Sequence, residues 1–451
     1  MSRAARAAPG ATRRLTIGWH QAGRSAGLAE HLDRYGPPPG RRDGQRRGLA
    51  EAVTEAGLAG RGGAGFPTGR KMRAVAAGRG PAVVVANGME SEPASRKDQA
   101  LLARAPHLVL DGAQAAAHAV GADVIHVCLD RTRAAQRAAV LRAIGERQQA
   151  GLDVVPTWVH ELPRRYTASE ASAVVRWLNG GDAKPVLTPP RLAERGVQRR
   201  PTLVDNVETL AHVALIARYG PGWFRQAGHP DVPGTMLVTT SGAVSDPGVY
   251  EIECGTWTGD VLAMSGAPAS GYVLVGGYFG TWHDIRDVAG LRLTTAGLRD
   301  AGASPGAGVL YILPEGGCGL AETARILRFL AEQGARQCGP CMFGLPAIAD
   351  DFARLSAARP DRGLLERLTV RLGVIAGRGA CHHPDGAVRL AASAMTAFAA
   401  DVRAHAAGHA CPAARAGLQG RPRALAGTVA QTWTVSRTRT ASRTRRDGGA
   451  R

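Results

Sequence analysis

Two stretches near the start of the chain combine residue types that could hold a phosphate group or a flat polar ring. The first, GLAGRGGAGFPTGRK over residues 57–71, has three glycines in the spacing G-x-G-x-x-G and ends in Lys71. Glycines allow close backbone approach and present N–H groups, and the lysine adds a positive charge. The second, VVVANGMESEPASRKD over 83–98, places Asn87, Glu90 and Glu92 after an apolar run. An amide can bond a ring edge, and carboxylates can accept from ribose hydroxyls.

Each stretch has a plain structural alternative. The glycine spacing is a weak signal in a chain with 59 glycines, and two exposed glutamates often form only a solvated turn. The glycine loop also precedes the first apolar strand, so the ordinary dinucleotide-binding fingerprint is not supported. However, two of the only three lysines, Lys71 and Lys97, fall in these two stretches, which composition alone rarely arranges.

Three cysteines in the C-terminal third could hold a metal or a cluster. Cys338 and Cys341 form a C-x2-C pair in ARQCGPC, and Cys381 follows forty residues later in RGACHHPDG. Thiolates at such spacing bind iron–sulfur clusters or zinc. The chain has seven cysteines, and in a cytosolic protein they are not expected to form disulfides. Cys128 and Cys254 lie in strand contexts and are predicted to be buried structural thiols.

These residues need elements to position them. Apolar runs at 82–87 and 124–130 predict buried strands, and the residues between them have helical periodicity. This pattern predicts an α/β domain over 48–230 with a largely parallel sheet. Ligands of such sheets lie beyond the carboxyl ends of the strands, where Asn87 and its two glutamates are expected.

Four further regions complete the predicted domain organisation. Short strands around turn signals over 235–315 predict a small β-grasp module, and residues 320–408 predict a helical bundle with the clustered cysteines on its loops. Residues 1–47 are expected to form a disordered basic arm with a short helix near 26–35, and residues 412–451 a disordered basic tail.

Composition limits the class of protein. The net charge is +19, but the basic residues crowd into the two ends and arginines outnumber lysines 53 to three, so solvated tails are a better interpretation than nucleic-acid binding. No run of eighteen apolar residues and no secretory signal occurs, which predicts a soluble, cytoplasmic protein without a transmembrane segment.

Taken together, the motifs identify a family. GRGGAGFPTGRK, N-x-x-E-x-E-P-x-x-x-K-D, RRYTASEASAVVRWLNG (164–180), RRPTLVDNVETLAHV (199–213) and SGAVSDPGVYEI follow one another in this order. The chain resembles the F subunit of NADH-quinone oxidoreductase and related diaphorase subunits over roughly residues 48–407. The resemblance implies a Rossmann-like FMN-binding domain, a β-grasp module and a helical domain that carries an iron–sulfur cluster.

The resemblance also implies residue roles. Phe66 would stack on the nicotinamide-side ligand and Glu92 would approach it, which makes these two the catalytic candidates. The residues expected to surround FMN are Gly60, Gly62, Gly63, Gly65, Lys71, Asn87, Glu90, Tyr166, Glu170, Asp205, Asn206 and Thr209. The cluster ligands would be Cys338, Cys341 and Cys381.

The chain departs from the family pattern on the nucleotide side. The departures are Arg73, Met89, Ala171, Thr188 and Arg191. Losing aromatic and charged partners, at roughly 1–3 kcal/mol each, predicts weaker NADH binding. The new arginines could instead clamp the extra phosphate of NADPH or stack on adenine.

The cysteine pattern is also incomplete, because Ala335 stands where the family has its first cluster ligand. A [4Fe–4S] cluster could be completed by a non-protein ligand or by another side chain, a [3Fe–4S] cluster needs only three thiolates, and a Cys3His zinc site is the structural alternative. The candidate side chains are Cys318, Cys411, His382 and His383.

The sequence therefore predicts a flavoprotein oxidoreductase, an NADH dehydrogenase that passes electrons from NAD(P)H through FMN to an iron–sulfur cluster. Its partner would be a ferredoxin-like or other redox subunit, and the chain could lie peripheral to a membrane complex. The alternative is an FMN-binding scaffold or altered-donor subunit that cannot use NADH, with zinc or no cluster.

Overall fold

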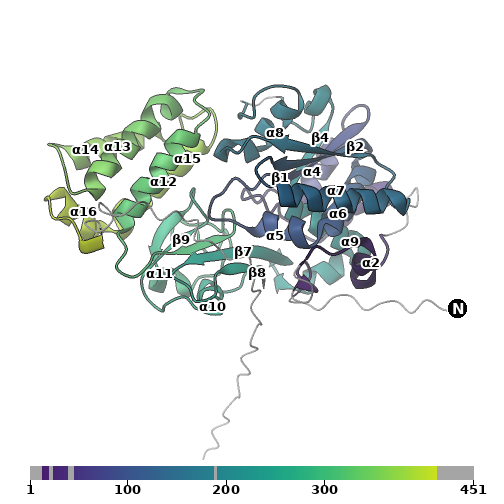
Figure 1. Cartoon of the computed structure of the whole chain (residues 1–451), viewed down its shortest axis with the longest axis horizontal. Helices are drawn as coiled ribbons and strands as arrows, with labels where there is room; N and C mark the ends of the chain where they lie inside the picture. The colour runs from purple at the N-terminus through teal and green to yellow at the C-terminus, as the bar shows by residue number, and fades with distance from the viewer. Residues whose placement is uncertain (1–12, 20–23, 39–44, 187–189, 414–451) are drawn as a thin grey trace, which may run out of the picture.

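The computed structural model describes residues 13–19, 24–38, 45–186 and 190–413. Three parts lie side by side in Figure 1: an α/β domain on the right, a mixed sheet below the centre and a helical domain on the left. This arrangement confirms the predicted fold class, whereas the exact domain boundaries remain predictions.

The α/β domain is built on a fully parallel sheet with the order β3-β2-β1-β4. Alternate residues of the central strand β1 face opposite cores: Val84 and Ala86 pack with α6 and α9, and Val83 and Val85 pack with α8. A strand covered on both faces must be apolar throughout, which explains the continuous run in the sequence. The strands are β1 (Ala82–Gly88), β2 (Ala122–Asp130), β3 (Thr157–Leu162) and β4 (Thr202–Asn206).

Helices surround this sheet. The predicted helical segment between β1 and β2 is divided in two at Ala105, because Pro106 favours the first turn of a new helix. The helices of the domain are α3 (Gln45–Glu55), α4 (Thr68–Ala76), α5 (Lys97–Arg104), α6 (Pro106–Val120), α7 (Ala134–Gln149), α8 (Ala171–Leu178) and α9 (Val207–Arg225), with short 3₁₀ turns η1 (Tyr166–Ser169) and η2 (Val197–Arg199).

The strand order places a crevice at one edge of the sheet. From β1 the chain continues to β2 and β3 on one side, whereas β4 pairs with β1 on the other. Asn87 and Asn206 are register partners at the carboxyl ends of β1 and β4. An open parallel sheet binds ligands where the strand order reverses. The fold therefore predicts a ligand site at the carboxyl ends of β1 and β4.

The second part is a five-stranded mixed sheet with the order β10-β9-β11-β7-β8. Its first and last strands, β7 and β11, lie parallel in the centre, and α10 packs on the sheet through Val261 and Leu262. This is the predicted β-grasp arrangement. Its elements are β7 (Thr235–Gly242), β8 (Gly248–Glu253), α10 (Thr258–Met264), β9 (Tyr272–Val275), β10 (Thr281–Asp284), α11 (Ile285–Ala289) and β11 (Val309–Ile312), preceded by the small pair β5 (Gly228–His229) and β6 (Val232–Pro233).

The third part is the predicted helical bundle. Leu330, Phe352 and Leu390 are fully buried in its core. The elements are α12 (Gly319–Gln333), the π-helical turn η3 (Pro340–Gly344), α13 (Leu345–Ser356), α14 (Leu364–Ile375), α15 (His383–Ala397) and α16 (Ala399–Ala406).

The prediction of a disordered arm over 1–47 is wrong for the residues that the structure describes there. The predicted short helix forms as α2 (Leu28–Tyr35), and Leu15, Trp19 and Tyr35 are buried in the α/β core. Residues 1–12 and 414–451, and with them most of the predicted tail, lie outside the described residues.

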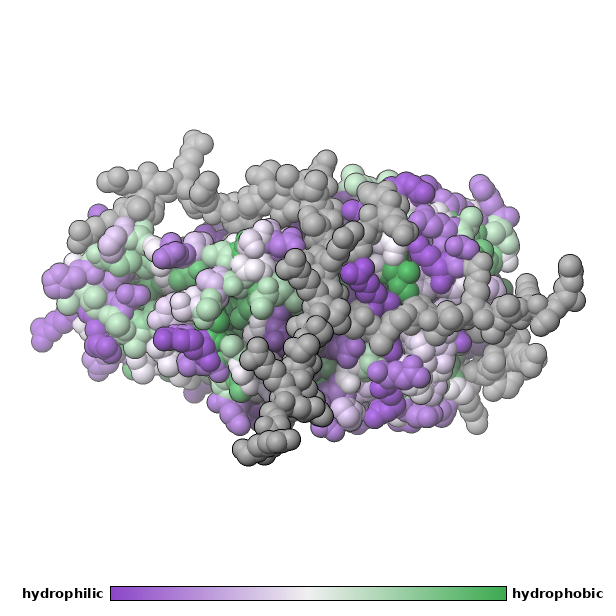
Figure 2. All heavy atoms as spheres, turned by 90° about the horizontal axis from the view of Figure 1, so that it is seen from below, coloured by the Kyte–Doolittle hydropathy of each residue, from purple (hydrophilic) through white to green (hydrophobic). Residues whose placement is uncertain are grey.

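No helix among the described residues is long and apolar enough to cross a membrane. On the face shown in Figure 2, hydrophilic side chains mark both ends of the molecule, and hydrophobic ones gather mainly in the left half.

Candidate functional site

A cavity of about 1000 Å³ lies beyond the ends of β1 and β4, where all three parts of the molecule meet. Every residue predicted to bind the cofactor or to act on the substrate lines this one cavity: Gly60, Gly62, Gly63, Gly65, Phe66, Lys71, Asn87, Glu90, Glu92, Tyr166, Glu170, Asp205, Asn206 and Thr209. Cys381 also lines it, whereas Cys338 and Cys341 do not. The functional roles of all these residues remain predictions.

The glycine loop forms one wall. Gly63 and Gly65 have positive φ angles of 100° and 63°, which side-chain-bearing residues rarely adopt. Two hydrogen bonds hold the loop, from Gly60 N to the Phe66 carbonyl at 2.9 Å and from Arg61 N to Thr209 Oγ1 at 2.8 Å. The second bond fixes the loop to the start of α9, so the wall is built before any ligand arrives.

An ion pair between a partly exposed lysine and a buried carboxylate lies next to this loop. Lys71 Nζ donates to Asp205 Oδ1 at 2.6 Å and to the Val204 carbonyl at 2.9 Å. Burial raises the pKa of the Asp205 carboxyl, and the charge of Lys71 opposes this shift. The second oxygen, Asp205 Oδ2, is buried and has no hydrogen-bond partner among the described residues. Because an unpaired buried acceptor is costly, this oxygen suits a donor supplied by a bound molecule.

The two asparagines at the strand ends already have partners within the protein. Asn87 Nδ2 donates to the Ser169 carbonyl at 2.8 Å and so holds the turn η1. Asn206 Oδ1 caps α9 by accepting from Glu208 N at 2.9 Å. Both side chains therefore shape the cavity as well as line it.

The two glutamates also bind protein groups. Glu90 accepts from Ser95 Oγ at 2.6 Å and from the first N–H groups of α5, including Asp98 N at 3.1 Å. Glu92 accepts from Tyr166 Oη at 2.7 Å and from Tyr278 N at 2.9 Å. Burial raises the pKa of both carboxyl groups. Glu92 thus joins the acidic loop to the β-grasp module.

Glu170 and Tyr166 also line the cavity. Glu170 caps α8 and accepts from Ser172 N at 2.9 Å. The Tyr166 ring contacts Phe279 with centroids 4.7 Å apart, and Phe279 contacts His383 at 5.4 Å. These rings connect the cavity to the first turn of α15.

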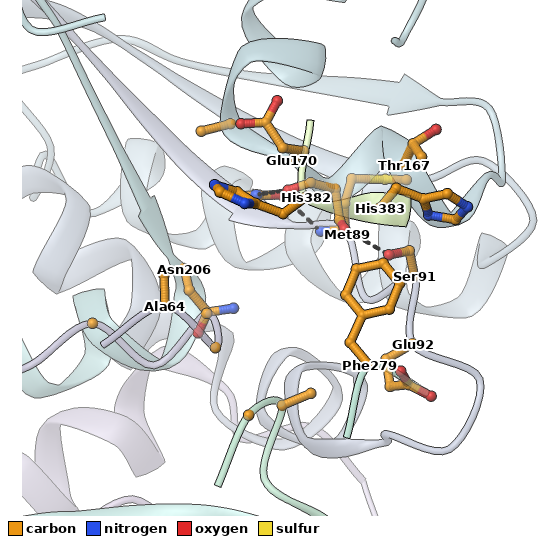
Figure 3. Close-up of a pocket in the computed structure, with 18 of the residues that line it drawn as sticks. Ala64, Met89, Ser91, Glu92, Thr167, Glu170, Asn206, Phe279, His382 and His383 are labelled. Carbon is orange, nitrogen blue, oxygen red and sulfur yellow. Dashed lines mark hydrogen bonds between the residues drawn. The ribbon is translucent and has the colours of Figure 1, made fainter. Parts of the chain in front are cut away.

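Residues that the sequence analysis missed come from the β-grasp module and the helical domain. A side chain at Gly277 would meet the Glu92 carboxylate at 2.8 Å, and one at Gly306 would meet the Gly276 carbonyl at 2.5 Å. The signals that could have identified them are the short motifs GGYFG and SPGAG. Figure 3 shows Ala64 beside Asn206 on one side of the cavity and Phe279, His382 and His383 on the other.

The departures from the family pattern fall in different places. Met89 and Ala171 line the cavity, so the missing acidic groups are missing from the cavity wall itself. Arg73 and Arg191 have exposed side chains and do not line the cavity, and Thr188 lies outside the described residues. Arg389, which was not predicted, lines the cavity from α15.

The three predicted cluster ligands gather beside this cavity. Cys341 is buried in the π-helical turn η3 and accepts from Arg336 N at 3.2 Å. Burial raises the pKa of Cys381, and the nearby Cys341 and Cys338 raise it further. Ala335 is buried where the fourth thiolate would be expected.

The spacing of these thiols favours a cluster over a single zinc ion. Two sulfurs on a tetrahedral zinc lie about 3.8 Å apart. Among the described residues, the group with ligand atoms all within 4.8 Å is Cys318, His405 and Cys411, and it does not include the three predicted ligands.

Two of the candidate fourth ligands lie too far from Cys338 to bind the same cluster. Cys318 caps the start of α12, and Cys338 follows the end of that helix, so the 15 residues of α12 separate them by about 22 Å at 1.5 Å per residue. Cys411 lies with Cys318. His382 is exposed, whereas His383 is buried, donates from Nε2 to the Leu330 carbonyl at 2.8 Å and has no hydrogen-bond partner for Nδ1 among the described residues.

These residues fit the two groups that the sequence predicts. The cavity has the volume of a cofactor site, and side chains at Gly276, Gly280 and Gly306 in its wall would collide with neighbouring backbone. Asp205 Oδ2 offers an unmet acceptor for a hydroxyl or ring N–H of FMN. Three thiols, two of which accept from backbone N–H groups, suit an iron–sulfur cluster.

Comparison with known proteins gives the same assignment. Residues 53–215 match the Nuo51 FMN-binding domain, and residues 321–405 match the NADH-ubiquinone oxidoreductase-F iron-sulfur binding region. The NADH-quinone oxidoreductase F subunit numbered 2 in Rhizobium meliloti is 30% identical over 380 residues, which cover 81% of this chain and 90% of that protein. The corresponding F subunit of Streptomyces coelicolor is 32% identical over 391 residues, covering 82% of this chain and 87% of that protein.

A solved structure agrees over most of the fold. A chain of the NAD+-reducing [NiFe]-hydrogenase in its H2-reduced state superimposes with a TM-score of 0.76 at 30% identity, covering 85% of this chain and 67% of that one. The chain belongs to the family of NADH-quinone oxidoreductase F subunits.

Proposed function

We propose that this chain is an NADH dehydrogenase subunit that binds FMN in the central cavity and an iron–sulfur cluster beside it. The observation that supports this most strongly is that Cys381 lines the same cavity as the glycine loop and the acidic loop. A hydride acceptor in the cavity would therefore lie next to a group that accepts single electrons. When bound, FMN supplies the exchange between two-electron and one-electron transfer.

Different residues of the cavity would bind different parts of FMN and of the nucleotide. The glycine loop and Lys71 would hold the phosphate and ring oxygens, and Asp205 Oδ2 would accept from the cofactor. Phe66, which is 47% exposed, would stack on the nucleotide that delivers the hydride. Glu92 would hold the acidic loop and Tyr166 in position for that nucleotide.

The decisive experiment is anaerobic mixing of the FMN-loaded protein with NADH or NADPH. We expect NADH to bleach the flavin absorbance. Bleaching by NADPH instead would identify an altered donor, and no bleaching with either would overturn the proposal in favour of an NADH-incompetent scaffold.

We further propose Cys338, Cys341 and Cys381 as the cluster ligands. With Ala335 in the fourth position, the cluster either lacks one iron or takes its fourth ligand from His382, His383 or a non-protein group. Electron paramagnetic resonance of the oxidised and dithionite-reduced protein distinguishes a [3Fe–4S] from a [4Fe–4S] cluster. Cys381→Ala should lower the iron content at least tenfold and leave FMN bound, and unchanged iron would contradict the ligand assignment.

The partner would be another redox subunit, docked on an apolar patch near the cysteines. The patch consists of Met342 and Phe343 in η3 and Val370 and Val374 on α14, with exposed fractions of 48–72%, and α14 packs against η3. Phe343→Asp should slow reduction of an added ferredoxin about tenfold or more and leave flavin bleaching unchanged. Val154→Asp, at an equally exposed position in the α/β domain, is the matched control. The cytoplasmic location expected from the sequence remains a prediction.

A further inference from the structure

A second group of metal-ligating side chains lies at the other end of α12 from the predicted cluster. Cys318 caps the start of α12, His405 lies in the last turn of α16, and Cys411 follows that helix by five residues. One ligand atom from each lies within 4.8 Å of the other two. The group brings together the beginning and the end of the helical domain.

The histidine is oriented as a metal ligand usually is. His405 is fully buried, and its Nδ1 lies 3.1 Å from the Leu355 carbonyl, which can only accept. Nδ1 must therefore carry the proton, and Nε2 keeps its lone pair. Nε2 accepts from Cys411 N at 3.1 Å and so lies on the side of the thiols, and this hydrogen bond must break when Nε2 binds a metal ion. A backbone carbonyl that fixes the tautomer in this way is typical of the outer contacts of metal-bound histidines.

The Cys318 sulfur is held in place by the start of α12. It is 7% exposed, and it accepts from Ala321 N at 3.4 Å in the first turn of α12. Burial raises the pKa of this thiol, and the N–H groups at the start of the helix oppose that rise. The group contains no carboxylate, so its ligand set is two sulfurs and one nitrogen, which suits zinc far better than a hard cation such as magnesium.

We propose that Cys318, His405 and Cys411 bind a zinc ion that fastens the end of α16 to the start of α12. Zinc–ligand bonds of about 2.0–2.3 Å require ligand atoms roughly 3.3–3.8 Å apart, a small contraction of the present group. Binding releases the two thiol protons, and no electrons are transferred. With three protein ligands, a water molecule would fill the fourth position on the zinc ion. The site is separate from the electron-transfer path, because Cys318 and Cys338 lie at opposite ends of α12.

The test is metal analysis of the full chain, purified without oxygen and loaded with FMN and iron. We expect one zinc per chain that survives dialysis against a weak chelator. His405→Ala and Cys411→Ser should each lower zinc at least tenfold and leave iron and flavin unchanged. His409→Ala is the matched control, because His409 is exposed and lies between these two ligands in the sequence.

A second readout does not depend on the variants. Cobalt added to the zinc-free wild-type protein should give thiolate-to-cobalt charge-transfer absorbance that is missing in Cys411→Ser. Absence of zinc and cobalt binding, or a Cys318–Cys411 disulfide in protein kept under reducing conditions, would overturn the proposal. Loss of iron in Cys411→Ser would also overturn it, because Cys411 would then belong to the cluster. Failure of flavin bleaching would affect the proposed dehydrogenase function alone.

Discussion

Glu90 and Glu92 illustrate how two like residues, two positions apart, are given different surroundings. The Glu90 carboxylate caps α5, and the Glu92 carboxylate joins Tyr166 to the backbone of Tyr278. Burial raises the pKa of both groups, yet each has several donors. At the residue scale the acidic loop is therefore a positioning device, and the catalytic role predicted for Glu92 depends on contacts that only a bound nucleotide would make.

Phe66 is the residue whose surroundings best suit direct contact with the nucleotide. Its ring lines the cavity, is half exposed and has the Arg70 guanidinium 5.6 Å from its centroid. Since stacking of a base on an aromatic ring is worth roughly 1–3 kcal/mol, Phe66→Ala should raise the KM for NADH about tenfold or more. Steady-state kinetics measures this, with flavin content expected to stay the same. Trp158→Ala, at an exposed ring on β3, is the control, and an unaltered KM in Phe66→Ala would remove Phe66 from the donor site.

The sequence identified one side of the cavity and missed the other for a physical reason. Glycine, lysine, asparagine and glutamate in two adjacent motifs carry chemistry that is visible in their types. Gly277 and Gly306 act through the absence of a side chain, and in a chain with 59 glycines that signal is hidden. Gly277 comes close to Glu92 only when the β-grasp module packs against the first domain, and Gly306 comes close to Gly276 only when the module itself folds.

At the scale of elements, one buried network holds the crevice together. Lys97 Nζ donates to Asp98 and to Glu208, both at 2.8 Å, and Asn206 Nδ2 donates to Asp98 at 2.7 Å. Glu208 also accepts from Leu237 N at 2.9 Å. The network joins α5, α9 and β7, so it couples the parallel sheet to the β-grasp sheet.

A threonine hydroxyl attaches the backbone of the glycine loop to α9. Thr209→Val keeps the shape of this buried side chain but removes the acceptor of the Arg61 N–H, a loss of about 1 kcal/mol or more. We expect FMN affinity to fall about fivefold or more while the fold is retained, as measured by fluorescence titration of the flavin-free protein. Thr369→Val, on the exposed side of α14, should bind FMN normally. Equal affinities would show that the loop does not need this bond.

A histidine pair at the edge of the parallel sheet should make stability depend on pH. His126 Nδ1 and His160 Nε2 lie 2.9 Å apart on β2 and β3. Burial, reinforced by His160 and Arg200, lowers the pKa of His126 to about 4. The unfolded chain would protonate this residue near pH 6.5, so its contribution to stability is complete above about pH 6.5, falls as the pH decreases and levels off below pH 4.

Thermal melts of wild type and His126→Asn between pH 7.5 and 4.5 test this dependence. The wild-type melting temperature should fall more steeply with decreasing pH than that of the variant. His409→Asn, an exposed histidine, should follow the wild type. Parallel curves for wild type and His126→Asn would contradict the assignment.

Helices and strands were predictable where the hydrophobic pattern of a single segment determines its secondary structure. The apolar runs gave β1 and β2, and helical periodicity gave α12 to α15. The π-helical turn η3 was not predictable, because its geometry depends on how Cys341 and Gly344 pack against neighbouring helices. The cysteine spacing indicated the chemistry of this turn but not its shape.

At the scale of the whole molecule, the N-terminal segment connects the first domain to the β-grasp sheet. The Glu251 carboxylate on β8 accepts from the N–H groups of Arg14, Leu15 and Thr16 at 3.0 Å. Arg14 Nη1 donates to the Phe224 carbonyl at 2.7 Å. A stretch with the composition of a disordered arm is ordered here because a carboxylate more than 230 residues away satisfies its backbone.

Removal of that carboxylate should release the segment. Glu251→Ala leaves three N–H groups without their acceptor, each worth about 1 kcal/mol or more. We expect the melting temperature to fall by several degrees and trypsin to cleave after Arg14 about tenfold faster, as followed by mass spectrometry. Glu315→Ala, at an exposed glutamate, should change neither property. A resistant Arg14 site in Glu251→Ala would mean that the segment is held by its apolar contacts alone.

The walls of the central cavity come from residues 60–71, 87–98, 166–171, 185–186, 204–209, 276–307 and 377–389. Because a chain leaves the ribosome from its N-terminus, the first domain can fold long before the last of these walls exists. The cavity is therefore enclosed only late in the biosynthesis of this protein, and a nascent chain that stops before residue 377 lacks the wall that the helical domain supplies.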